Sequence, residues 1–181
     1  DVEFNLIIPM VILVIISALF SMSETVFSSV NVIRLKTNIE DGISGSKKAY
    51  WITENFDLTI TTILVGNNLA NIALATISVS FWSSIFTAQP TIINIVNTVV
   101  MTIIILIFGE ILPKSFARNN ADSIALKFSG IFYYIIQIFR PLTWIFRKIK
   151  IWIVTDTQDE RVSVTRDELE TIIDTMEEEG S

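Results

Sequence analysis

The stretch ILIFGEILPKSF, residues 105–116, places a glycine, an acid, a proline and a lysine at the end of a long apolar segment. The residues before it are mostly Ile, Val, Thr and Met, a composition suited to lipid or to a deeply buried helix. A carboxylate at membrane depth costs about 3 kcal/mol or more, so Glu110 is a functional candidate by default. Glu110 is followed three residues later by Pro113, and explaining this pair is central to both the fold and the function.

The composition places the chain among membrane proteins. Of its 181 residues, 51% are hydrophobic, and the mean hydropathy of +0.57 is high for a soluble domain. It has no cysteine and no histidine, which excludes disulfides, thiolate metal sites and the usual general base. A metal site must then be built from oxygen atoms, which favours Mg²⁺, Ca²⁺, Mn²⁺ or Na⁺ over Zn²⁺ or Cu²⁺. The net charge of -6 comes mainly from the last residues, and no nucleic-acid partner is expected.

Three segments are apolar over the roughly 20 residues that a bilayer crossing requires, at about residues 6–28, 58–82 and 91–112. The loop between the first two carries four Lys or Arg residues, and the part after the third carries nine. The stretch before the first segment and the loop between the second and third carry no Lys or Arg. The positive-inside rule therefore places the N-terminus outside and the C-terminus in the cytoplasm. The chain is therefore predicted to be an all-α, multi-pass protein of the plasma membrane.

The apolar stretch after the third segment is interrupted by charges and by Pro141. A full crossing would put Arg147, Lys148 and Lys150 outside, against the positive-inside rule. We predict two cytoplasmic juxtamembrane amphipathic helices, broken near Pro141, with a fourth span as the alternative.

The last part of the chain changes character, because Thr165 and Glu168 form a capping box for an acidic helix outside the membrane. We expect this helix to begin a cytosolic region that is truncated here. The predicted organisation is a three-span core at residues 1–121 with a cytoplasmic loop at 30–57, juxtamembrane helices at 122–154 and the acidic region at 155–181.

Polar residues in the first span follow a helical spacing. Ser17, Ser21, Glu24 and Ser28 are separated by four, three and four residues and share one helix face, whereas Ser23 lies off it. Helix–helix packing is the alternative reading of the serines, because serine is common between membrane helices.

In the third span, Pro113 has no N–H and clashes with the carbonyl four residues back, which belongs to Gly109. The span is predicted to be broken at Gly109–Pro113, with a backbone oxygen freed beside the Glu110 carboxylate. Broken helices serve ion sites in transporters in this way. The alternative is a capped helix end with Glu110 paired to Lys114 at i+4.

In the second span, Asn67 and Asn71 stand at i and i+4 on one face, where interhelical hydrogen bonding is the alternative role. Together the three spans offer five oxygen ligands, one of them a carboxylate, and a second serine would supply a sixth, which suits a hard cation such as Mg²⁺. The predicted ligands are Ser21, Asn67, Asn71, the carbonyl of Gly109, and Glu110. A second group of candidates is Ser17, Ser23 and Glu24.

At these residues the sequence resembles the CorC/CNNM (cyclin M) family of magnesium transporters. The resemblance is carried by LFSMSETVFSSV, VGNNLAN and FGEILPKSFA, in this order. It implies a homodimer of three-span protomers with a cytoplasmic belt of juxtamembrane helices, and an Mg²⁺ site at the five predicted ligands. It also implies Mg²⁺ export coupled to Na⁺ entry, and ATP-binding CBS domains later in the full-length chain.

We predict a transport domain that binds a dehydrated Mg²⁺ between its spans and works by alternating access; a membrane-anchored Mg²⁺ sensor is the alternative. An enzyme is not expected, because Lys114 and Ser115 are adjacent on a helix and do not face each other. Dimer contacts are expected on the second span at Ala70, Leu74 and Ala75.

Overall fold

The structure is a computed structural model that describes residues 2–87 and 89–154. The described part is helical and contains no strand, which confirms the predicted all-α class. The acidic region predicted at 155–181 lies outside the described residues. The elements are α1 (Val2–Ser29), α2 (Val32–Glu40), α3 (Ser46–Glu54), α4 (Phe56–Ile85), α5 (Pro90–Ile104), the π-helical segment η1 (Ile105–Ile111) and α6 (Leu112–Val154).

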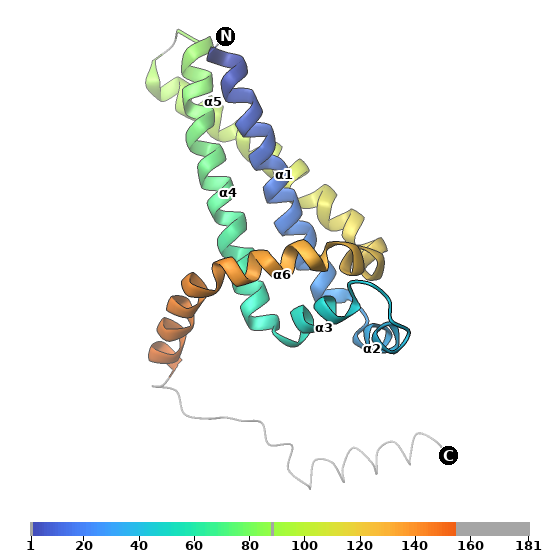
Figure 1. Ribbon diagram of the computed structural model, residues 1–181. Coiled ribbons are helices and arrows are strands. Elements are labelled where there is room, and N and C mark those ends of the chain that lie inside the picture. Colours follow the sequence, from blue (N-terminus) through green and yellow to red (C-terminus); the bar gives the residue numbers. More distant parts are fainter. Residues whose placement is uncertain (1, 88, 155–181) are drawn as a thin grey trace, which may run out of the picture. The chain divides into compact units, whose positions relative to one another are not determined.

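Three helical stretches among the described residues are long and apolar enough to cross a membrane, as predicted: Asn5–Ser29, Phe56–Ile85 and Pro90–Ile145. The third joins α5, η1 and part of α6 into one stretch. Figure 1 shows that α1 and α4 run antiparallel. Helix α1 packs against α4 and η1, while α5 packs against α4. Large apolar side chains remain exposed along these helices, as expected for surfaces that face lipid.

The third span is not broken at Gly109–Pro113, and this part of the prediction is wrong. The N–H of Leu112 bonds to the carbonyl of Ile107, five residues back, and the helix continues through Pro113 as α6. A π turn holds one extra residue, so the backbone around Pro113 no longer has the α-helical register in which proline clashes. The helical backbone is interrupted later, at Asn120, where φ is -131° and ψ is 20°.

The predicted break near Pro141 is also absent, since α6 continues past this proline to Val154. The non-helical backbone inside α6 lies at Asn120 instead, and after this kink α6 crosses the end of α1 beside α2 and α3 (Figure 1). Among the described residues, those from Trp144 to Val154 are grouped in a second unit. The domain boundary drawn from the sequence at residue 121 stays a prediction.

The hydrophobic core lies where α2, α3 and α6 join the end of α1. The Phe132 ring of α6 meets Phe20 edge-on at 5.9 Å and Phe27 at 5.6 Å, both on α1. Trp51 of α3 contacts Tyr133 at 4.9 Å. Such aromatic pairs contribute about 0.5–1.5 kcal/mol beyond their area of burial. They fix the short helices and α6 against the spans.

The expected dimer contacts at Ala70 and Leu74 are not available on this surface. These side chains are 4% and 0% exposed inside one protomer, because the face of α4 that carries them packs within the bundle. Gly66 lies on the same face, and a Cβ there would fall 2.2 Å from the Phe20 ring. The glycine thus permits the close approach of α1 and α4.

Gly45 attaches the α2–α3 connection to α6. Its φ of 86° lies in the left-handed region, and a Cβ there would be 2.1 Å from the Leu126 carbonyl oxygen. The Ser129 hydroxyl donates to the Gly45 carbonyl at 2.9 Å. The α2–α3 connection therefore contacts the backbone and the Ser129 side chain of α6 so closely that only glycine fits at position 45.

Gly45→Ala should lower the free energy of unfolding by about 2–5 kcal/mol, from left-handed strain plus overpacking. The matched control is Gly42→Ala, because Gly42 also has a positive φ, of 72°, but no atom within 4 Å of the added Cβ. That control should cost only the strain, about 1–2 kcal/mol. Unfolding in detergent measures both, and equal losses would show that the contact with α6 is unimportant.

Candidate metal site

Three helices meet at Ser17, Asn67 and Gly109. Ser17 is fully buried, and its hydroxyl donates to the Asn67 side-chain oxygen at 2.8 Å. A Cβ on Gly109 would lie 3.0 Å from the same hydroxyl oxygen, so η1 reaches α1 closely only because this residue is glycine. The structure therefore brings two of the five predicted ligands, Asn67 of α4 and Gly109 of η1, to Ser17 of α1. Ser17 was only in the second group of candidates predicted from the sequence.

Ser21 and Asn71 carry buried oxygens, Oγ and Oδ1, that have no hydrogen-bond partner in the described part of the chain. Each stands four residues from the level of the Ser17–Asn67 bond. Because α1 and α4 run antiparallel, Ser21 lies about one helical pitch to one side of this level and Asn71 about one pitch to the other. Buried acceptors without partners are rare and are expected where a ligand or water binds.

Glu110 follows Gly109 on η1 and is half-buried. Both ion pairs found among the described residues leave this carboxylate out. No group of three or more acidic, His or Cys side chains that could hold a metal occurs in the described part. A cation here would depend on one carboxylate and several neutral oxygens.

The π turn also supplies backbone oxygens beside Glu110. The Leu112 N–H is used by Ile107, and Pro113 has no N–H. The Phe108 carbonyl therefore has no donor four residues ahead, at Leu112, or five residues ahead, at Pro113. The Gly109 carbonyl has no donor four residues ahead, because that residue is Pro113. The sequence predicts a freed carbonyl only at Gly109, because this residue is four residues before Pro113 in α-helical register.

Lys114 pairs with Glu24 of α1, and not with Glu110 as the alternative reading held. Its Nζ lies 2.9 Å from a Glu24 carboxylate oxygen. Lys114 thus reaches across to α1 in the structure, although Glu110 stands only four residues before it on its own chain. The other second-group serine, Ser23, donates to the Leu19 carbonyl of its own helix at 2.7 Å.

Asn97 of α5 was missed by the sequence argument. It is 5% exposed, and its side-chain oxygen has no partner among the described residues. It shares a buried face with Ile93 and Met101, four residues away on either side. An asparagine four residues from Ile93 and from Met101 within an apolar run was the signal that could have found it.

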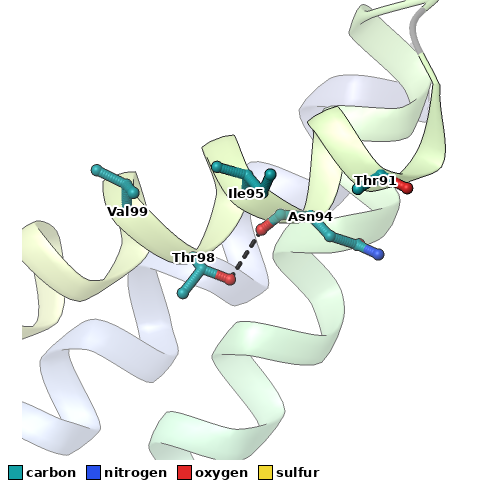
Figure 2. A pocket seen from close by; sticks show the side chains of 5 residues that line it. All are labelled: Thr91, Asn94, Ile95, Thr98 and Val99. Atoms are coloured by element: carbon teal, nitrogen blue, oxygen red, sulfur yellow. Dashed lines mark hydrogen bonds between the residues drawn. The ribbon is translucent and has the colours of Figure 1, made fainter.

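An open hollow of about 360 Å³ lies elsewhere, on the surface of α5 (Figure 2). One helix supplies its whole lining, Thr91, Asn94, Ile95, Thr98 and Val99. The Thr98 hydroxyl in it donates to the Asn94 backbone carbonyl at 2.8 Å, so the two polar groups satisfy each other. The hollow contains none of the candidate ligands and is not the metal site.

Comparison with known proteins agrees with the arrangement of three spans. The family described as "Cyclin M transmembrane N-terminal domain" matches residues 8–181. The chain belongs to the CorC/CNNM family. It is a multi-pass membrane protein of this family.

Relatives of the CNNM domain are found in several bacteria. A "UPF0053 protein" of Haemophilus influenzae is 34% identical over 141 residues, which is 78% of this chain and 33% of the relative. The "UPF0053 inner membrane protein YfjD" of Escherichia coli is 30% identical over 74% of this chain and 31% of its own length. A "UPF0053 protein MG146" of Mycoplasma genitalium is 25% identical over 97% of this chain and 41% of its own length. The chain thus spans about a third of the length of the first two relatives.

Ser17→Ala should destabilise the CNNM domain by about 0.6 kcal/mol, the usual contribution of a hydrogen bond between membrane helices. Ser23→Ala is the matched control, because Ser23 is 3% exposed but bonds only within α1. Unfolding in detergent, in a double-mutant cycle with Asn67→Ala, isolates the α1–α4 bond. Additive losses in that cycle would mean that the bond contributes nothing.

Proposed function

We propose that this CNNM domain carries Mg²⁺ across the membrane by alternating access, with the ion bound between α1, α4 and η1. The observation that carries the proposal is the setting of Glu110. It is a half-buried carboxylate in a membrane-grade helix, outside the ion pairs found among the described residues. Such a group is expensive unless a cation neutralises it.

The neutral oxygens around Glu110 suit Mg²⁺, which prefers oxygen ligands in an octahedral shell and dehydrates reluctantly. The Asn67 side chain and the Gly109 carbonyl are proposed ligands at the level of Ser17. Ser21 and Asn71 are proposed to complete the shell from either side, directly or through a bridging water. Their unpartnered oxygens support these roles.

The π turn is proposed to be the moving part. π turns occur often at functional sites, and loss or transfer of the extra residue rotates every side chain that follows. At η1 such a change would turn Glu110 and the backbone carbonyls of Phe108 and Gly109 relative to α1 and α4. Two discrete registers of one helix give the two states that alternating access requires.

Further features are proposed on the strength of the family. These are Mg²⁺ export coupled to Na⁺ entry, a homodimer, and a place in the plasma membrane, with cytosolic CBS domains in the full-length chain. The exposed apolar side chains of α4 and α5 are compatible with both lipid and a second protomer. The N-terminus is proposed to lie outside and α2, α3 and the later part of α6 at the cytoplasmic interface.

Glu110→Gln should weaken Mg²⁺ binding at least about 100-fold, because the ion would be buried without a counter-charge. Asn71→Ala should weaken it about tenfold or less, since a water can replace one neutral ligand. Titration calorimetry on purified protein measures both. The controls are Glu54→Gln, an exposed acid of α3, and Asn68→Ala, whose exposed amide bonds to Leu64 of its own helix at 2.8 Å.

Sealed liposomes containing a Mg²⁺ dye then separate transport from binding alone. Flux in the wild type and none in Glu110→Gln supports a transporter. Binding without flux would instead favour the membrane-anchored sensor. Wild-type Mg²⁺ affinity in Glu110→Gln would show that the carboxylate is not a ligand.

The orientation is testable because the chain has no cysteine. Gln89→Cys, at the exposed start of α5, should react with a membrane-impermeant thiol reagent added to intact cells. Glu40→Cys, at the exposed end of α2, should react only after permeabilisation. The reverse pattern would invert the proposed topology.

A further inference from the structure

We propose that Glu24 is a positioning residue, which holds the Lys114 ammonium away from the Glu110 carboxylate and keeps Glu110 available to the cation. The inference rests on the proposed function, because it assigns Glu24 a part in the same Mg²⁺ site. It differs from a ligand role, which the sequence suggested for Glu24.

The geometry of the pair supports this role. Lys114 and Glu24 join α6 to α1 at 2.9 Å, across the same helices that bound the candidate site. Glu24 stands three residues after Ser21, and Lys114 four residues after Glu110, so the pair lies about one turn from two proposed ligands. The side chains are 34% and 38% exposed, so water reaches the pair in part.

A free lysine at this place would compete with the cation. Its flexible stem and point charge can reach a carboxylate one turn away, and the attraction is stronger near lipid than in water. An ammonium on Glu110 would neutralise the one charge among the proposed ligands. Glu24 prevents this by supplying Lys114 with another carboxylate.

The remaining ion pair of the described residues does not offer Lys114 a substitute. Asp122 accepts from the Arg34 guanidinium and from the backbone N–H of Asn31, so it is already engaged. Without Glu24, the acid one turn back on its own chain is the partner that Lys114 would meet. Glu24 thus binds the lysine and leaves Glu110 available to the divalent ion.

The test is a double-mutant cycle on the purified protein, with Mg²⁺ affinity measured by titration calorimetry. Glu24→Gln should weaken Mg²⁺ binding about three- to tenfold, a size set by a partly exposed charge pair. Lys114→Gln should bind at least as tightly as the wild type. The double variant Glu24→Gln/Lys114→Gln should recover the affinity of Lys114→Gln, because the competing ammonium is gone.

Several outcomes would overturn the inference. If Glu24 is a ligand, the double variant stays as weak as Glu24→Gln. If Glu24→Gln binds like the wild type, the pair has no effect on the site. Loss of folded protein is separated from both, because calorimetry reports stoichiometry independently of affinity. A wild type that binds no Mg²⁺ overturns the proposed function and this inference with it, whereas the first two outcomes overturn this inference alone.

Discussion

The close approach of three helices at one level of the bundle is the constraint on which the rest of the structure depends. Gly109 lets η1 come within reach of the Ser17 hydroxyl, and Gly66 lets α4 accept the Phe20 ring of α1. Apolar attraction between helices is weak in lipid, so small residues and hydrogen bonds must hold the contact. The Ser17–Asn67 bond supplies the polar part of it. A bundle joined in this way brings neutral oxygens together near Gly109, which the half-buried Glu110 follows.

Three charged side chains, Glu24, Glu110 and Lys114, stand on the helices that make this contact. Two carboxylates and one lysine stand within about a turn of each other, and the lysine is bound to only one of the carboxylates. The second, Glu110, takes part in neither ion pair found among the described residues and follows Gly109, which approaches Ser17 of α1. In the proposed site one carboxylate would supply the only ligand charge, so that occupancy would depend on helix register and on any nearby cation.

The junction at the end of α1 and the region of η1 differ in the number of contacts that stabilise them. Aromatic contacts, the Gly45–Ser129 bond and the Arg34–Asp122 pair fasten α2, α3 and α6 to the end of α1. The region of η1 instead contains a π turn, a proline and buried oxygens without partners. Stability is thus concentrated beside the candidate site, which agrees with the proposed change of register in η1.

The sequence by itself determined the helical membrane class, the three spans and the residue types of the site, because apolar length and helical spacing are local properties. It also determined that any metal ligands are oxygens, since the chain has no cysteine and no histidine. Only the tertiary structure decided the register of the third span, which forms a π turn at Ile105–Ile111 and continues through Pro113 as α6, and the place of the kink at Asn120. It likewise decided that Lys114 binds Glu24, and that Ser17 reaches Asn67. These choices depend on which helix lies opposite, and hydrogen-bond register and ion pairing are settled by competition between neighbours that are distant in sequence.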